Sequence, residues 1–212
     1  MISLQLAINH KRFPAATGSP ERTLYRDFTL DVAAGTTVAL LGPSGLGKTT
    51  LLNIVAGLDT DFEGAVRFSP KAPRFGYAFQ NPRLLPWRTV LENVLLAAGR
   101  GTEARARELL TQAGLGAALE AYPERLSLGQ QRRVGLIRAL AAEPDVLLLD
   151  EPLASLDAQT AARLEAMLAR QLEARPATVL LVTHDRTEAG RLARRIVTLD
   201  GPPVRIAADD PA

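Results

Sequence analysis

The chain has 212 residues, enough for one large domain or for one domain with an inserted lobe. Its 25 basic and 23 acidic residues give a formal net charge of +2, which offers no argument for a nucleic-acid partner. The sequence has no cysteine, which excludes disulfides and zinc–thiolate sites, and no apolar run near the roughly 20 residues of a membrane span, so we do not expect a channel.

The first third of the chain alternates apolar and polar residues in short segments that predict β-strands. Residues 1–8 and 28–32 predict antiparallel strands, and the Pro-, Gly- and Ser-containing stretch from His10 to Arg22 predicts a loop between them. We therefore expect an N-terminal strand where a secreted protein would have a signal peptide. Further strands are expected at 38–41, 64–68 and 76–80, the last two as a pair.

From Asn81 the pattern changes to helical periodicity. Helices are expected at 89–98, at 103–113 and at 129–141. Strands at 146–149, 179–182 and 195–199 then alternate with helices at 158–174 and 187–193. The run 146–149 is too apolar for a half-exposed strand, which places it in a parallel sheet.

These elements predict an α/β fold over residues 1–212. We expect a core with a mainly parallel sheet from 1–80 and 142–212, which includes an N-terminal antiparallel β subdomain. Residues 81–141 are expected to form an inserted α-helical subdomain.

One stretch has the spacing and setting of a phosphate-binding loop, because it joins a predicted strand to an apolar helical pattern. It reads Gly42-Pro43-Ser44-Gly45-Leu46-Gly47-Lys48-Thr49-Thr50. Its glycines let the backbone N–H groups approach a polyphosphate, and the helix start favours anions. We expect Lys48 to bind the β and γ phosphates and Thr49 to bind the Mg²⁺ that bridges them. An incidental glycine-rich turn is the alternative, but the chain contains only three lysines, Lys11, Lys48 and Lys71.

Two acids, Asp150 and Glu151, follow the buried strand 146–149. In phosphate-loop enzymes an Asp at this place holds the metal, and Glu151 would orient or deprotonate the attacking water. Acids at a strand end that only face water are the alternative.

Ser127 and Gln130 have the spacing of a helix capping box. An ordinary helix start explains that spacing. The same helix start, with the Ser127 hydroxyl and Gly129, also offers a free helix N-terminus to an anion.

The order of these motifs resembles the ATPase subunit of an ATP-binding cassette (ABC) transporter over essentially the whole chain. The series is Gly42–Thr49, Gln80, Leu126–Gln130, Asp150–Glu151, Ser155–Asp157 and His184. The resemblance implies that Gln80 senses the metal and the γ phosphate and that Leu126–Gln130 is the signature motif. It also implies that Asp157 lies on a loop at a dimer interface, where it can be a helix N-cap as well, and that His184 contacts the γ phosphate.

The resemblance also implies the partners and the activity. Two subunits would pack head to tail around ATP and Mg²⁺, so that the signature helix of one closes on the nucleotide held by the other. The homodimer would hydrolyse ATP at the cytoplasmic face of the inner membrane and drive a separate integral permease. A periplasmic or extracellular solute-binding protein is an expected further partner, and nucleic acid is not.

Two positions depart from the family pattern. Leu128 stands where the signature usually has Gly, and since Leu disfavours positive φ we expect a weaker signature contact. The family usually stacks an N-terminal aromatic residue on adenine, and here Phe13 and Tyr25 are the nearest candidates, although each also suits a loop or the core.

The stretch Gln80–Val94 resembles importer subunits of the nitrate, sulfonate and taurine type, in which it faces the membrane partner. Trp87, the only tryptophan, either packs within the helical subdomain or contacts that partner. The chain ends soon after its last predicted strand, so we expect no C-terminal regulatory domain. The alternatives are a soluble cassette ATPase acting on nucleic acid or ribosomes, an exporter subunit, and a phosphate-loop kinase or switch.

Overall fold

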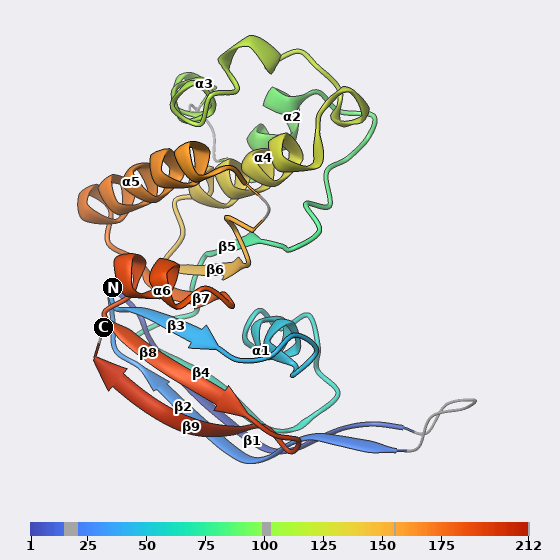
Figure 1. Cartoon of the computed structure of the whole chain (residues 1–212), viewed down its shortest axis with the longest axis vertical. Coiled ribbons are helices and arrows are strands. Elements are labelled where there is room, and N and C mark those ends of the chain that lie inside the picture. Colours follow the sequence, from blue (N-terminus) through green and yellow to red (C-terminus); the bar gives the residue numbers. More distant parts are fainter. Residues whose placement is uncertain (15–20, 99–102, 155, 212) are drawn as a thin grey trace. The chain divides into compact units, whose positions relative to one another are not determined.

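The computed structural model describes residues 1–14, 21–98, 103–154 and 156–211. The chain folds into two compact units, and each is described by itself. Unit 1 comprises Met1–Ala72 and Thr178–Ala212, and unit 2 comprises Pro73–Ala177 (Figure 1). In the described part of the chain no helix is both long and apolar enough to cross a lipid bilayer.

The N-terminal part of unit 1 is a three-stranded antiparallel sheet. Its order is β2-β1-β4, from β1 (Ser3–Phe13), β2 (Arg22–Val32) and β4 (Glu63–Ser69). Alternate residues of β1 are fully buried, as the two-residue period of a half-exposed strand requires.

Both long strands extend further than the sequence predicted. The expected loop from His10 to Arg22 is wrong at its ends, because β1 continues to Phe13 and β2 begins at Arg22. Lys11 explains the extension, since its buried ammonium lies 2.9 Å from Asp59 Oδ1 and donates to Asp61 O. Residues 15–20 of that loop lie outside the described residues.

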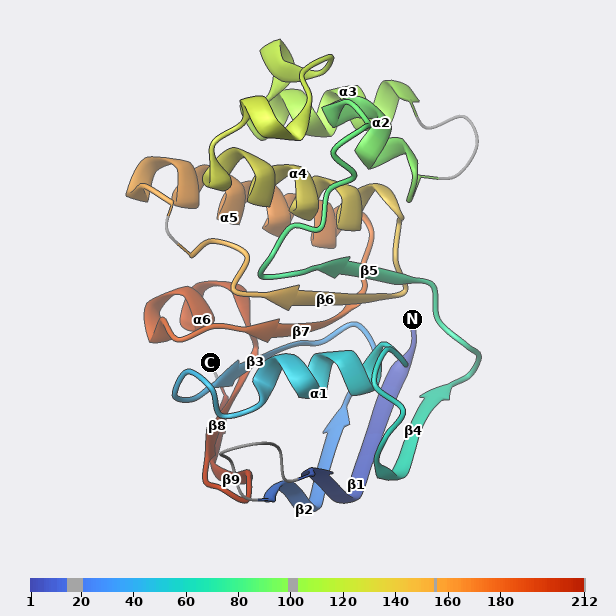
Figure 2. The same cartoon turned by 90° about the vertical axis from the view of Figure 1, so that its right-hand side faces the viewer.

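The second sheet of unit 1 has the order β7-β3-β8-β9 (Figure 2). β3 (Thr37–Leu41) is parallel to β7 (Thr178–Val182) and to β8 (Arg195–Asp200). α1 (Lys48–Val55) contacts β7, and α6 (Arg186–Leu192) contacts β3.

The strand at 195–199 was predicted to be the last one, and this is wrong. β9 (Arg205–Pro211) pairs antiparallel with β8 at the sheet edge. Its polar, mostly exposed residues hide the strand from a hydrophobicity pattern. Arg195 of β8 stabilises the pair through two contacts of 2.7 Å with the carboxylate of Asp209.

Within residues 73–98, 103–154 and 156–177, unit 2 contains a short pair of parallel strands and four helices. β5 (Phe75–Ala78) pairs with β6 (Val146–Asp150). The helices are α2 (Val90–Leu95), α3 (Glu103–Gln112), α4 (Leu128–Ala141) and α5 (Ala158–Ala174), with single 3₁₀ turns at Gly116–Ala118 and Pro123–Arg125. α4 packs on α2, α3 and β5.

The predicted pairing of strands 64–68 and 76–80 is wrong, because β4 pairs with β1 and β5 pairs with β6. Gly76 gives the reason for the placement of β5. A Cβ at Gly76 would lie 2.4 Å from Ala139 O, so the absence of a side chain lets β5 approach the backbone of α4.

The predicted helix at 89–98 is shorter in the structure, where Thr89 is the N-cap of α2 and the helix ends at Leu95. Residues 81–141 lie in unit 2, which also contains β5, β6 and α5. The predicted limits of a helical subdomain at 81 and 141 stay a prediction.

Candidate functional site

The phosphate loop of unit 1 joins β3 to α1, as the motif requires. Gly45 and Gly47 have positive φ angles of 75° and 111°, a region that residues with a Cβ disfavour. At Gly42 the restriction is steric, because an added Cβ would lie 2.8 Å from Leu199 O. Gly47 is the N-cap of α1 and supplies no side-chain cap, so the first N–H groups of the helix are not capped by it.

Lys48 organises the loop from within. Its Nζ donates to Gly42 O at 2.7 Å and to Pro43 O at 2.9 Å, and the side chain is buried. The ammonium therefore lies inside the curve of the loop backbone. The Thr49 hydroxyl belongs to the first turn of α1 in an exposed residue.

Strand β2 supports the same loop from outside, which sequence reasoning missed. The fully buried Tyr25 donates its phenolic O–H to Gly47 O at 3.0 Å, and an added Cβ at Gly47 would lie 2.8 Å from Leu24 Cδ1. Burial raises the pKa of Tyr25, so the phenol stays a protonated donor near neutral pH. The buried ring cannot stack on adenine, whereas Phe13, the other candidate, is 44% exposed.

His184 follows β7 in the same unit. Leu40 of β3 is level with Val182 of β7, and Gly42 and His184 each follow this pair by two residues. Since parallel neighbouring strands end at one edge of a sheet, the register brings the exposed His184 and the start of the phosphate loop to that edge. The Asp185 carboxylate caps α6 by accepting from Thr187 N, a bond that lowers the pKa of Asp185.

Unit 2 brings together Gln80 and Glu151. The parallel register of β5 and β6 continues past the strand ends, and Gln80 Nε2 donates to Glu151 Oε2 at 3.2 Å. Glu151 has a positive φ of 48°, an uncommon conformation that turns the chain sharply after β6. Asp150 ends β6 as a buried carboxylate, and its charge adds to the burial that raises the pKa of Tyr77.

The predicted signature residues form the start of α4. Gln130 N donates to Ser127 Oγ at 3.2 Å and Ser127 N donates to Gln130 Oε1 at 2.8 Å, a complete capping box. Leu128 is the first helical residue, does not have positive φ and is 54% exposed. A Leu therefore fits this backbone without the strain that a left-handed turn would cause.

The segment before α5 is hydrogen-bonded to α4. Asp157 caps α5 by accepting from Thr160 N at 2.9 Å, so its predicted N-cap role is present, and Arg132 of α4 donates to Ala154 O at 2.6 Å. Ser155, which is part of the motif series, lies outside the described residues.

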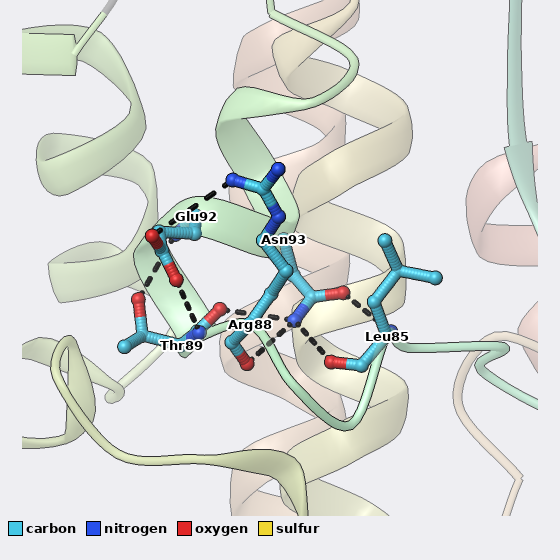
Figure 3. Close-up of polar contacts among 5 residues, drawn as sticks. All are labelled: Leu85, Arg88, Thr89, Glu92 and Asn93. Atoms are coloured by element: carbon cyan, nitrogen blue, oxygen red, sulfur yellow. Dashed lines mark hydrogen bonds and ion pairs between the residues drawn. The ribbon is translucent and has the colours of Figure 1, made fainter.

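Trp87 lies in a tight turn that precedes α2. Arg88 N donates to Leu85 O at 3.1 Å, which closes a turn with Trp87 inside it, and the tryptophan side chain is 70% exposed. Packing within the helical part of unit 2 therefore does not account for this residue. The turn is held by Asn93 (Figure 3), a polar residue on an apolar helical face that was not among the predicted site residues.

The donor types fit the predicted Mg²⁺, a hard cation that prefers oxygen ligands. Thr49 offers a hydroxyl, Asp150 a carboxylate and Gln80 an amide oxygen, since the Gln80 Nε2 is the atom bonded to Glu151. Each of these oxygens is a type that Mg²⁺ accepts.

A family profile and individual relatives both place this sequence in one family. The ABC transporter family profile matches residues 25–154. The relative named aliphatic sulfonates import ATP-binding protein SsuB 2, from Burkholderia lata, is 45% identical over 193 residues, or 88% of this chain and 71% of that protein. A protein named SsuB 1 from Xanthomonas axonopodis pv. citri is 43% identical over 216 residues, or 96% and 83% of the two chains.

Solved structures that are similar to this chain belong to the same family. A dimeric structure of MJ0796, described as a bacterial ABC transporter cassette, matches with a TM-score of 0.86 at 31% identity and 98% coverage of both chains. A second structure of this ATP-binding cassette, in a post-hydrolysis state with ADP and Pi, matches with a TM-score of 0.84 at 30% identity. The chain therefore belongs to the ABC transporter family and is one of its ATP-hydrolysing subunits.

Proposed function

We propose that this chain powers the import of a small organic anion through a separate membrane permease, and that this anion is an aliphatic sulfonate. The observation that carries the proposal is the phosphate loop with Lys48 Nζ held 2.7 Å from Gly42 O. The relatives named for aliphatic sulfonate import support the choice of solute, because they are 43–47% identical over most of this chain.

ATP would be held by the backbone N–H groups of Gly42–Thr50 and by Lys48, which would exchange its loop carbonyls for phosphate oxygens. His184 would contact the γ phosphate, which agrees with its place beyond β7 at the edge where the loop begins. Phe13 is the exposed aromatic candidate for the adenine contact.

Mg²⁺ would be held by Thr49, Asp150 and Gln80 together with phosphate oxygens. When bound, it would neutralise charge on the phosphates. Gln80 would link this ion to Glu151, because its side-chain nitrogen already donates to that carboxylate.

Glu151 would orient a water molecule against the γ phosphate and accept its proton. Its hydrogen bond from Gln80 and the sharp turn at φ 48° support this role, since both fix the direction of the carboxylate.

The working unit would be a homodimer that shares two nucleotides. Ser127, Gly129 and Gln130 of one subunit would approach ATP on the other, with Asp157 near the same interface. ATP would stabilise the closed dimer because both subunits touch the γ phosphate, and hydrolysis would remove that contact. The dimer would bind its permease at the cytoplasmic face of the inner membrane, and a solute-binding protein would deliver the sulfonate from outside.

Two substitutions test the ATPase part. Lys48→Ala should weaken ATP binding at least tenfold, because it removes the charge aimed at the phosphates, whereas Lys71→Ala serves as a control at an exposed lysine. Glu151→Gln should retain ATP binding and lower phosphate release by roughly 10²–10⁴-fold. Turnover of Glu151→Gln equal to that of the parent would show that another group activates the water.

The solute part needs the assembled transporter in vesicles. Uptake of a labelled alkanesulfonate should depend on ATP and should stop with Glu151→Gln. Uptake of a neutral alcohol of similar size should change neither with ATP nor with the substitution. ATP-driven movement of sulfonate out of the cytoplasmic side would contradict import.

A further inference from the structure

A half-open cavity of about 380 Å³ lies in unit 2, and none of its lining residues is one that we assign to the nucleotide. The ends of α4 and α5 and the starts of β5 and β6 line it, and α3 contributes one side chain. A volume of this size lies in the range of small-molecule sites.

Arginine donors dominate the polar part of the cavity. Arg74, Arg105 and Arg175 line it, and each guanidinium carries five N–H donors. Arg105 of α3 donates to Glu108 Oε2 on the same helix and to Gln171 Oε1 on α5, so its side chain connects the two helices. The exposed Arg74 guanidinium has neither a hydrogen bond nor an ion pair with the rest of the described chain.

Both carboxylates that line the cavity already have a partner within it. Glu143 is ion-paired with Arg175, and Asp145 Oδ2 accepts from Arg74 N at 2.9 Å. N–H groups of the three guanidiniums therefore remain in excess, and a ligand rich in acceptor oxygens would satisfy them.

The rest of the lining narrows the class of ligand. Pro144 and Leu172 are half-buried and Pro176 is exposed, and together they offer an apolar surface suited to a short alkyl chain. The carboxyl ends of α4 and α5 carry partial negative charge, which disfavours a polyanion such as ATP. A monoanion with a small aliphatic body fits both conditions.

The cavity touches four elements at the ends opposite to their predicted nucleotide residues. Arg74 precedes β5 and Gln80 follows it, while Asp145 precedes β6 and Asp150 ends it. In the same way, α4 runs from Ser127 to the cavity residues near Leu140, and α5 runs from Asp157 to those near Arg175. Since helices and strands are stiff, a ligand that shifts one end shifts the other.

We propose that this cavity binds a small organic oxyanion, a carboxylate or sulfonate with a short alkyl chain, and that its occupancy changes the rate of ATP hydrolysis. Binding stands on the cavity alone, and the effect on rate rests on the proposed function. A sulfonate ligand would be the imported solute acting on its own transporter, whereas a carboxylate would report a separate metabolite.

Calorimetry on the full chain without nucleotide tests the binding, with hexanesulfonate, hexanoate and uncharged hexanol as probes. At least one oxyanion should bind saturably at or below about 1 mM, and hexanol should not. Arg74→Ala should weaken that binding about tenfold, because it removes a charged donor while the backbone N–H to Asp145 stays. Arg170→Ala, at an exposed arginine of α5 outside the cavity, should bind like the parent.

Tighter binding of hexanesulfonate would identify the ligand as the imported solute, and tighter binding of hexanoate would identify it as a separate metabolite. Either result supports the site. Absence of saturable binding, equal binding of hexanol, or unchanged binding in Arg74→Ala would overturn it. Because calorimetry needs no ATP, such a failure would leave the ATPase function unaffected.

The rate is measured as phosphate release with and without a saturating oxyanion. Parent and Arg170→Ala should change at least twofold, and Arg74→Ala should respond only at about tenfold higher oxyanion concentration. Binding that leaves the rate unchanged would overturn the regulatory part.

Discussion

The side chains of Lys48 and Tyr25 hold the backbone of the phosphate loop in place. Lys48 bonds to the carbonyls of Gly42 and Pro43, and Tyr25 bonds to the carbonyl of Gly47. In the proposed function the lysine would exchange its partners for phosphate, whereas the phenol is fully buried. Tyr25 is therefore a structural support of the loop.

We expect Tyr25→Phe to lower the free energy of unfolding by about 1 kcal/mol, the usual net value of one hydrogen bond. The cost stays moderate because Gly47 O also accepts from Leu51 N at 3.0 Å. Denaturant unfolding checks the value, with Tyr122→Phe at a 41% exposed tyrosine as the control. A loss as small as that of the control would mean that the phenol does not stabilise the loop.

The same phenol has a defined pH dependence. Burial raises the folded pKa of Tyr25 above the unfolded value of about 10, so its contribution is complete below pH 10 and is lost as pH rises toward the folded pKa. Above pH 10 the parent should therefore lose stability more steeply than Tyr25→Phe.

The sequence predicted the residues of the loop but not its support. Glycine spacing and Lys48 are local signals, because the motif is contiguous. Tyr25 is 22 residues from Gly47, and an aromatic residue in an alternating strand looks like any core residue. Only the packing of β2 on the loop gives the hydroxyl its partner.

Among the elements of unit 2, the turn before α2 is unusually well held. Asn93 is fully buried; its Nδ2 donates to Leu85 O, Arg88 O and Thr89 O at 2.9–3.1 Å, and its Oδ1 accepts from Leu85 N at 2.8 Å (Figure 3). Thr89 and Glu92 add a capping box. This one side chain replaces the hydrogen bonds that a regular element would supply, and it fixes the turn that carries Trp87.

Asn93→Ala should leave those backbone groups without their partners and loosen the turn. Trp87 is the only tryptophan, so its fluorescence anisotropy reports the turn directly. We expect lower anisotropy and easier quenching than in the parent, with ATP binding retained. Asn9→Ala, at an exposed asparagine of β1, is the control, and an unchanged anisotropy in Asn93→Ala would show that the turn does not depend on Asn93.

Sequence patterns predicted the elements with regular hydrophobic periods and missed those held by polar contacts. The buried runs of β3, β6 and β7 and the helix α5 were predicted within one residue at each end. β9 was missed because Asp209 and Arg195 stabilise it by charge, and the end of β1 was missed because buried Lys11 looks like a loop residue. A period in hydrophobicity does not record such pairs.

At the scale of the whole molecule, the predicted nucleotide residues are distributed over both units. Unit 1 carries Lys48 and His184, and unit 2 carries Glu151 and Ser127. The predicted core of residues 1–80 and 142–212 contained Lys48, Glu151 and His184 together, and that division of the chain stays a prediction. The antiparallel pairing of residues 1–8 with 28–32 was predicted, whereas the other strand pairs came from the structure. The proposed dimer gives Ser127 a reason to be exposed at the start of α4 although its hydroxyl already caps the helix.

Ser127→Asp separates the capping role from the role at the dimer interface. Aspartate is as good an N-cap as serine, so α4 should persist, but its charge would face the partner's phosphates in the closed dimer. In a Glu151→Gln background with ATP and Mg²⁺, we expect gel filtration to give a dimer, and the added Ser127→Asp to weaken dimerisation at least tenfold. Thr89→Asp puts the same charge at the capping box of α2 and should leave the dimer intact. A dimer of unchanged affinity in Ser127→Asp, with both variants equally folded, would mean that the start of α4 stays away from the shared nucleotide.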